Sequence, residues 1–386
     1  MNADGVVLVV LPANGVTQGV APDTMVAGLP LVRRIVLAAA TAGYARVLVR
    51  AGAPGLGELL DGTDAVVLTT PTALSPLTGR RLVLLPANVV PQARWLRTLR
   101  EMPMGTESVH VDPSRTAVID TVHAPTVVAA ALQSASAEAV VAELRGKLVE
   151  TTTPIEPDGR VVLDTAADVP RAEAWLLRSL IKQNEGFMSR HFERRLSLAL
   201  TRRLATTAMT PNAMTVISLA VGLLSAPFFL SSMPAWQLTG ALLFLVHSIL
   251  DGCDGELARL KFLQSKTGAV LDYWGDNVVH VAVFGCIAIG WSLGTGRAWP
   301  LLVGGLAILA MLGSATLMFR PTVDDVAGGS SAGARFARAV SHRDFIYIVI
   351  LASAFGKAHW CLVAAAVGAP SFFALVWWQR RRGRVP

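Results

Sequence analysis

The chain has 386 residues, of which 53% are hydrophobic and 16% are charged, and its mean hydropathy is +0.51. Soluble domains carry about a quarter charged residues, so this composition excludes a wholly soluble protein. The formal net charge is +7. Much of the basic charge lies beside apolar segments, as in residues 380–384, which follow Trp377 and Trp378. Because that pattern is typical of a membrane anchor facing anionic lipid, we expect no nucleic-acid partner.

Residues 1–165 alternate short β-rich segments with helical patterns. The N-terminus has no basic segment ahead of its first apolar run, so we expect no secretory signal and a cytoplasmic domain. Strands are predicted at residues 5–11, 45–50, 65–68, 81–85 and 161–164, and helices at residues 31–42 and 93–102. This alternation predicts an α/β domain of the Rossmann type with a mostly parallel sheet.

The remainder of the chain contains six apolar segments. They occupy residues 212–231, 235–250, 277–296, 298–319, 345–356 and 358–378. A membrane span needs about 20 predominantly apolar residues, so the second and fifth segments are short. We expect the second to continue through Arg259 and the fifth to begin near Ser341. The prediction for residues 211–386 is therefore an all-α six-helix transmembrane bundle.

The orientation of this bundle follows from the distribution of basic residues. With the N-terminal domain in the cytoplasm, the loops and tail on that side hold eleven Lys and Arg residues. The loops on the opposite side hold only Arg297 and Lys357. We therefore expect both termini and the active site on the cytoplasmic side of the membrane.

A basic amphipathic helix is predicted just before the first span, at residues 189–204. Apolar residues recur there every four positions, and arginines occupy much of the rest; the apolar residues are Phe192, Leu196, Leu200 and Leu204. This pattern favours a helix lying in the membrane interface, with a soluble linker helix as the alternative. We assign residues 166–210 to a linker that includes this helix.

Residues 251–276 read DGCDGELARLKFLQSKTGAVLDYWGD. Asp251 and Asp254 are three residues apart and Asp272 and Asp276 four apart, so each pair shares one helix face. Two antiparallel helices joined by a short turn would bring the pairs together. Ionisable groups at the edge of apolar helices are functional candidates. Four carboxylates in one partly dry pocket require divalent cations, and Mg²⁺ prefers carboxylate and phosphate oxygens.

This segment resembles the CDP-alcohol phosphotransferase family. The matching positions, with the intervals of that family, are Asp251, Asp254, Gly255, Ala258, Arg259, Gly268, Asp272 and Asp276. A calcium-binding loop, the main alternative, would have alternating acidic residues and a terminal Glu, which are absent here. The resemblance implies an enzyme that transfers a substituted phosphate from a CDP-alcohol to an acceptor hydroxyl and releases CMP.

The resemblance also implies roles for individual residues. Asp251, Asp254 and Asp272 would ligate one or two Mg²⁺ or Mn²⁺ ions, and Asp276 would be the general base while also touching metal. Residues implied in nucleotide binding are Gly255, Ala258, Arg259 and Gly268, with Asn212 and Thr215 from a Pro-Asn-x-x-Thr element at the first span. Lys266 and Arg343 are candidates for binding an anionic acceptor. For Arg343, an anchor at the membrane surface is an equal alternative.

The order of the two halves resembles the bifunctional inositol-phosphate cytidylyltransferase and di-myo-inositol-phosphate-phosphate synthase family. Residues 26–49 are similar to a sugar-phosphate nucleotidyltransferase, and residues 172–218 strengthen the likeness. The resemblance implies an inositol-phosphate-like acceptor and a homodimer. However, Asp23 is the only charged residue between positions 11 and 29, and Asn88 stands where a metal-binding Asp is expected. We therefore predict a degenerate nucleotidyltransferase-like domain.

Two other functions remain open from the sequence. A phospholipid synthase would use CDP-diacylglycerol as donor with the same chemistry. A cation transporter would also place carboxylates in a membrane, but near the bilayer midplane and often in repeated halves. Here the carboxylates cluster at one edge of the spans, which favours the enzyme.

Overall fold

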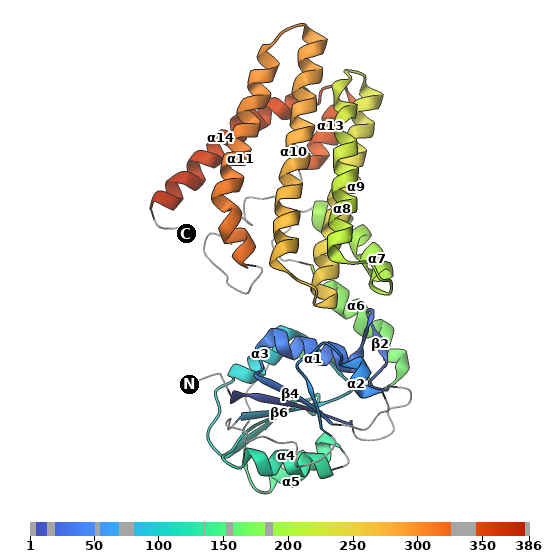
Figure 1. Cartoon of the computed structure of the whole chain (residues 1–386), viewed down its shortest axis with the longest axis vertical. Helices are drawn as coiled ribbons and strands as arrows, with labels where there is room; N and C mark the ends of the chain where they lie inside the picture. Colours follow the sequence, from blue (N-terminus) through green and yellow to red (C-terminus); the bar gives the residue numbers. More distant parts are fainter. Residues whose placement is uncertain are drawn as a thin grey trace. The chain divides into compact units, whose positions relative to one another are not determined.

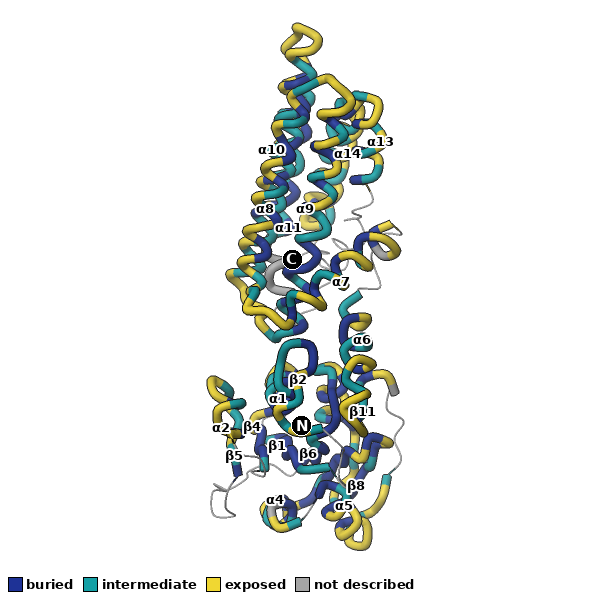
Figure 2. The backbone as a smooth tube through the Cα atoms, turned by 90° about the vertical axis from the view of Figure 1, so that its right-hand side faces the viewer, coloured by how far each residue is buried: buried dark blue, intermediate teal, exposed yellow. Residues whose placement is uncertain are grey.

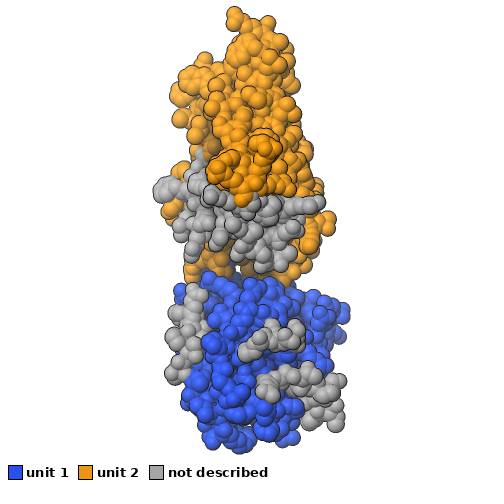
Figure 3. Space-filling view, turned by 90° about the vertical axis from the view of Figure 1, so that its left-hand side faces the viewer, with its two compact units in different colours: residues 1–176 blue, residues 177–386 orange. Residues whose placement is uncertain are grey.

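The structure of the chain is a computed structural model, which describes residues 5–13, 20–50, 55–68, 81–134, 136–151, 157–181, 188–325 and 345–382. It divides into two compact units, Met1–Leu176 and Leu177–Pro386, which Figure 3 distinguishes by colour. The finer division predicted from the sequence, with limits at residues 165 and 210, stays a prediction.

The N-terminal unit is built on a seven-stranded mixed sheet with the strand order β10-β8-β9-β6-β1-β4-β5. The strands are β1 (Val7–Leu11), β4 (Arg46–Arg50), β5 (Val66–Leu68), β6 (Arg81–Pro86), β8 (Ser108–Val111), β9 (Ala117–Asp120) and β10 (Val149–Glu150). Strands β6, β1, β4 and β5 pair in parallel, and β9 runs antiparallel to both β6 and β8. The predicted α/β class is confirmed, and its sheet is mixed.

Helices cover both faces of this sheet. The helices are α1 (Leu31–Ala42), α2 (Leu56–Leu59), α3 (Ala93–Glu101), α4 (Ala124–Gln133) and α5 (Ala137–Arg145). Figure 1 shows α1 and α3 on one face and α4 and α5 on the other. All five residues of β1 are buried, as Figure 2 shows by colour. A strand covered on both faces needs a continuous apolar sequence, which β1 has in Val-Leu-Val-Val-Leu.

Two two-stranded antiparallel sheets lie outside the main sheet, and the first of them is a hairpin. They pair β2 (Met25–Val26) with β3 (Leu29–Pro30), and β7 (Val89–Pro91) with β11 (Arg160–Val162). The second sheet brings the predicted strand near residue 161 back to the segment that follows β6. Helix α6 (Val169–Ser179) comes next, and the carboxylate of Glu173 accepts a 2.8 Å hydrogen bond from Ala27 N. This hydrogen bond connects α6 to the β2–β3 hairpin.

The C-terminal unit is helical in its described residues. Its elements are η5 (Ser189–Glu193), α7 (Arg194–Ala205), α8 (Pro211–Ser225), η6 (Ala226–Leu230), α9 (Pro234–Lys261), α10 (Lys266–Thr295), α11 (Trp299–Asp325), α13 (Phe345–Ala354) and α14 (His359–Arg381). Within the described ranges, five segments are long and apolar enough to cross a membrane: α8 with η6, α9, α10, the first 21 residues of α11, and α14.

The fifth predicted span corresponds to α13. Its ten described residues rise about 15 Å, half of a typical hydrocarbon core, and its predicted start near Ser341 lies outside the described residues. The second span does continue past its charged positions, because α9 runs to Lys261. Helix α8 packs against both α9 and α10, and α11 packs against α10 and α14. Many apolar side chains of these helices remain exposed, as expected for surfaces that face lipid.

Candidate active site

The site forms where α9 ends and α10 begins. Helix α9 ends at Lys261, and the next residue, Phe262, has a left-handed φ of 58°. Ser265 precedes helix α10 as its N-cap, and its hydroxyl accepts a 3.0 Å hydrogen bond from the backbone N–H of Gly268. This short turn reverses the chain, and the helices on either side of it both pack against α8.

Three carboxylates converge at this turn. Asp251 and Asp254 on α9 are each 5% exposed, and Asp272 on α10 is half-buried. One carboxylate oxygen of each lies within 4.8 Å of the others. The sequence predicted that the two helices would bring these side chains together, and the structure does so through α8, against which both helices pack.

Helix α8 contributes two further predicted residues. Thr210 caps it by accepting a hydrogen bond from Ala213 N. The buried Thr215 hydroxyl donates a 2.5 Å hydrogen bond to Asp254 Oδ2, which fixes one carboxylate of the cluster. Asn212 is exposed, and its Oδ1 lies 2.9 Å from the position of a Cβ added to Gly268. Gly268 therefore provides the room in which the Asn212 amide lies.

The other predicted nucleotide residues lie along α9. Gly255, Ala258 and Arg259 are half-buried, and Arg259 Nη1 is 3.2 Å from the position of a Cβ on Gly255. The guanidinium thus folds back over this glycine. Lys266 is exposed at the first position of α10, and Arg343 lies outside the described residues.

Asp276 stands apart from the three-carboxylate group. It is one turn beyond Asp272, and its Oδ1 is 3.6 Å from Nε2 of His247. His247 is 3% exposed, and its Nδ1 lies 2.9 Å from the carbonyl oxygen of Ser218. Sequence reasoning missed His247, although a single histidine four residues before Asp251 in an apolar helix was a usable signal.

A second polar cluster, also missed, joins α7 to the opposite side of α9. Glu256 is 1% exposed. Its Oε1 accepts hydrogen bonds from Arg194 Nη1 and Ser197 Oγ, and its Oε2 accepts one from Thr201 Oγ1, each at 2.7 Å. We call these four residues the Glu256 clamp. Its signal in the sequence was the spacing of Arg194, Ser197 and Thr201, which places two hydroxyls and one guanidinium on one face of α7.

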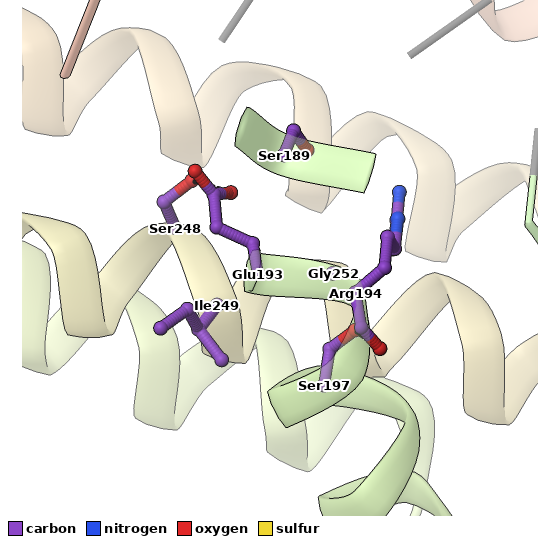
Figure 4. Close-up of a pocket in the computed structure, with 7 residues that line it drawn as sticks. All are labelled: Ser189, Glu193, Arg194, Ser197, Ser248, Ile249 and Gly252. Atoms are coloured by element: carbon purple, nitrogen blue, oxygen red, sulfur yellow. Dashed lines mark hydrogen bonds between the residues drawn. The ribbon is translucent and has the colours of Figure 1, made fainter. Parts of the chain in front are cut away.

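The same junction contains a small pocket whose lining includes Arg194 and Ser197 of the clamp. Figure 4 shows it between η5, α7 and α9, with the Glu193 side chain directed at Ser248. The Ser248 hydroxyl donates a 3.2 Å hydrogen bond to Glu193 Oε2. In contrast, Phe192 and Leu196 are 46% and 45% exposed. Glu193 and Ser197 therefore face the protein, whereas Phe192 and Leu196 face outward; that the helix lies in the membrane interface stays a prediction.

The donor set fits a divalent cation. Like charges this close in a partly buried site repel strongly, and carboxylate oxygens are the ligands that Mg²⁺ and Mn²⁺ prefer. Asp251, Asp254 and Asp272 would hold such an ion. Residues 208–378, which include all of these positions, match the family model described as CDP-alcohol phosphatidyltransferase. The C-terminal unit contains a CDP-alcohol phosphotransferase domain.

Curated relatives of this domain's family are transferases. The chain is 34% identical over 158 residues to a bifunctional IPC transferase and DIPP synthase of Thermococcus kodakarensis, which covers 41% of this chain and 34% of the relative. It is 32% identical over 99 residues to a CDP-diacylglycerol–serine O-phosphatidyltransferase of Mycobacterium bovis, covering 23% of this chain and 34% of the relative. The chain thus spans about a third of the length of these relatives.

A solved structure with a low overall similarity is that of the Mycobacterium tuberculosis phosphatidylinositol phosphate synthase with CDP-DAG bound. Its TM-score is 0.34 and its sequence identity 19%, over 47% of this chain and 94% of that one. The assignment of the CDP-alcohol phosphotransferase domain rests on the family model and the sequence relatives, and the Glu256 clamp lies partly outside it, because α7 ends before residue 208.

Proposed function

We propose that this chain is a metal-dependent enzyme that transfers a substituted phosphate from a CDP-alcohol to an acceptor alcohol and releases CMP. The observation that carries the proposal is the convergence of Asp251, Asp254 and Asp272 within a CDP-alcohol phosphotransferase domain. A pyrophosphate donor brings several negative charges, so a site for it needs cations and fixed positions more than covalent chemistry.

In this proposal the three carboxylates hold one or two Mg²⁺ or Mn²⁺ ions, which supply charge neutralisation at the pyrophosphate when bound. Thr215 keeps Asp254 in place through its hydrogen bond. Asn212 lies against Gly268, and the Arg259 guanidinium lies over Gly255, with Ala258 on the same helix as Arg259. These five residues would receive the cytidine and its phosphates.

Asp276 is the proposed general base. The acceptor oxygen attacks the phosphorus that carries the alcohol, the bond from that phosphorus to the CMP oxygen breaks, and the hydroxyl proton passes to the Asp276 carboxylate. General-base catalysis of this kind contributes about 10²- to 10⁴-fold to a rate. The neighbouring His247 packs against this carboxylate and limits the directions in which it can turn.

The acceptor is proposed to be a phosphorylated polyol of the inositol-phosphate kind. The support is the sequence similarity to relatives named as bifunctional IPC transferase and DIPP synthase, together with the exposed Lys266 beside the site. Arg343 remains a candidate for the same acceptor. A second candidate donor is CDP-diacylglycerol, favoured by the similarity to the serine O-phosphatidyltransferase of Mycobacterium bovis.

We further propose six membrane spans, with both termini and the active site in the cytoplasm, and a homodimer. The distribution of basic residues supports the orientation, and five sufficiently long apolar helices support the membrane location. The N-terminal unit is proposed to be a degenerate nucleotidyltransferase domain. The Asn88 side chain supports this, because its Nδ2 donates a 3.0 Å hydrogen bond to Leu163 O and so stabilises the pairing of β7 with β11.

The test is CMP release by the purified full chain in detergent with Mg²⁺. The panel of donors contains soluble CDP-polyols and CDP-diacylglycerol, and the panel of acceptors contains inositol phosphates, glycerol phosphate and serine. We expect release with a CDP-polyol and an inositol phosphate, and none from Asp272→Ala. Release with CDP-diacylglycerol alone would establish the second donor, and no release above Asp272→Ala with any pair would refute the proposed function.

A further inference from the structure

The Glu256 clamp occupies a particular place on the catalytic helix. Glu256 follows Asp254 by two residues, which is about 200° around an α-helix, so the two carboxylates point to opposite sides of α9. Asp254 and Asp251 face the site, and Glu256 faces α7. The clamp therefore binds α9 to α7 on the side of α9 that faces away from the proposed metal. It lies within one helical turn of Asp254.

Polar contacts hold this junction together. The α7 residues buried against α9 include Ser197 and Thr201, at 1% and 0% exposure, whereas Leu196 of α7 is 45% exposed. A helix beside lipid gains little from apolar contact with its neighbour, so hydrogen bonds and close packing must hold it in place. Three hydrogen bonds converge on the Glu256 carboxylate, one of them from a guanidinium, and such charge-assisted bonds are the stronger kind.

The sequence of α9 leaves space for the clamp. A Cβ on Gly252 would stand 2.9 Å from Arg194 Nη1, so any larger residue there would displace the guanidinium that reaches Glu256. In the sequence, Glu256 lies between Asp254 and Arg259, two site residues on the same helix. A rotation of this part of α9 would therefore move the side chains of both.

We propose that Glu256 is a positioning residue of the metal site: by fixing α9 against α7, it sets the rotation of α9 that brings Asp251 and Asp254 towards Asp272. This inference deepens the proposed function and rests on it. Glu256 touches neither substrate nor metal in this proposal, and it acts through the helix that carries the ligands.

The experiment compares Glu256→Gln with Glu193→Gln in the full chain. Both glutamates are almost fully buried in the same junction, but Glu193 bonds Ser248, which lies eight residues, or about 12 Å of helix, before Glu256. Binding of Mn²⁺ is measured by electron paramagnetic resonance without substrate, and CMP release is measured against Mn²⁺ concentration. Substitutions around metal ligands typically weaken metal binding 10- to 100-fold.

We expect Glu256→Gln to raise the Mn²⁺ dissociation constant about tenfold, to raise the Mn²⁺ requirement of CMP release equally, and to recover most of its turnover at saturating Mn²⁺. Glu193→Gln should match the wild type in both measurements. Equal Mn²⁺ affinity in the two variants would overturn the inference while leaving the proposed function intact. Wild-type protein that binds no Mn²⁺ would overturn both.

Thr201→Val serves as a second variant, because it removes one bond to Glu256 and retains the shape of the side chain. We expect a loss of Mn²⁺ affinity in the same direction and smaller than that of Glu256→Gln. If Glu256→Gln does not fold, unchanged Mn²⁺ affinity in Thr201→Val overturns the inference by itself.

Discussion

The two units differ in the charge that lies next to the buried aspartates Asp112, Asp251 and Asp254. In the N-terminal unit, Asp112 is 3% exposed and forms a 2.5 Å ion pair with Arg160. In the C-terminal unit, Asp251 and Asp254 are similarly buried but lie against a third carboxylate, Asp272. A buried charge with an opposite partner is an ordinary feature of protein architecture. Like charges gathered in one place indicate a site made for a ligand of the opposite sign.

The other buried polar groups of the N-terminal unit follow the architectural pattern. Arg34 is 1% exposed and donates hydrogen bonds to the carbonyl oxygens of Val26 and Ala27. Burial lowers the pKa of this guanidinium to about 10, and the nearby Glu173 carboxylate opposes that shift. These bonds hold the β2–β3 hairpin against α1, and the bond from Ala27 N to Glu173 holds it against α6. From this comparison we expect the chemistry in the C-terminal unit and a structural role for the described buried polar groups of the other.

Metal removal should have the largest effect. With excess chelator, CMP release should fall to background because the carboxylates of the cluster repel one another and the donor. Asp251→Ala should reproduce this loss even with Mg²⁺ present. The check is CMP release before and after chelation, with elemental analysis for retained metal. Full activity in chelator with no metal in the protein would contradict the metal assignment.

Asp276→Asn should lower turnover by about 10²- to 10⁴-fold and leave donor binding near the wild-type value, because the amide retains the shape of the side chain but cannot accept the proton. Single-turnover CMP release and equilibrium binding of the CDP-alcohol separate the two effects. Normal turnover in a folded variant would remove Asp276 from the proposed mechanism.

Asp112→Asn makes the same chemical change at the buried carboxylate of the N-terminal unit. Breaking one partner of a buried ion pair costs about 3–5 kcal/mol, so thermal unfolding of this unit should occur at a lower temperature. CMP release below that temperature should be unchanged. A specific loss of turnover in the folded variant would mean that the N-terminal unit takes part in the transfer reaction, and the contrast between the units would then fail.

Sequence reasoning found the carboxylate cluster because its information is local. Asp251 and Asp254 share a helix face through their spacing, as do Asp272 and Asp276, and a four-residue turn limits where the second pair can lie. The same reasoning located β1, β4, β5, β6 and α1, whose apolar patterns are continuous or strictly periodic.

The features that were missed depend on distant partners. Arg194 and Glu256 are 62 residues apart in the chain, and nothing local indicates that α7 turns its hydroxyl face towards α9. Strands β8 and β9 were also missed. Each has only four residues, and their sequences include His110 and Asp120. Pairing within the sheet, rather than local pattern, decides their conformation.

The smallest expected effect concerns Asn88, at the position where a metal-binding Asp is expected in an active nucleotidyltransferase. Asn88→Asp would supply that carboxylate, but the native amide is 8% exposed and donates to Leu163 O. A carboxylate cannot donate this bond and would face a carbonyl oxygen, so we expect a loss of about 1–3 kcal/mol in stability.

Residues 11–29 still offer no cation to a triphosphate, and nucleotidyl transfer needs one in its transition state. Neither the wild-type chain nor Asn88→Asp should therefore release pyrophosphate from CTP with Mg²⁺ and any polyol phosphate. A fragment of residues 1–181, which retains the bond between Glu173 and Ala27, should behave in the same way. Sustained pyrophosphate release by the wild-type chain would instead show that both units are enzymes. The difference between the paired carboxylate of the N-terminal unit and the clustered carboxylates of the C-terminal unit would then not separate a structural unit from a catalytic one.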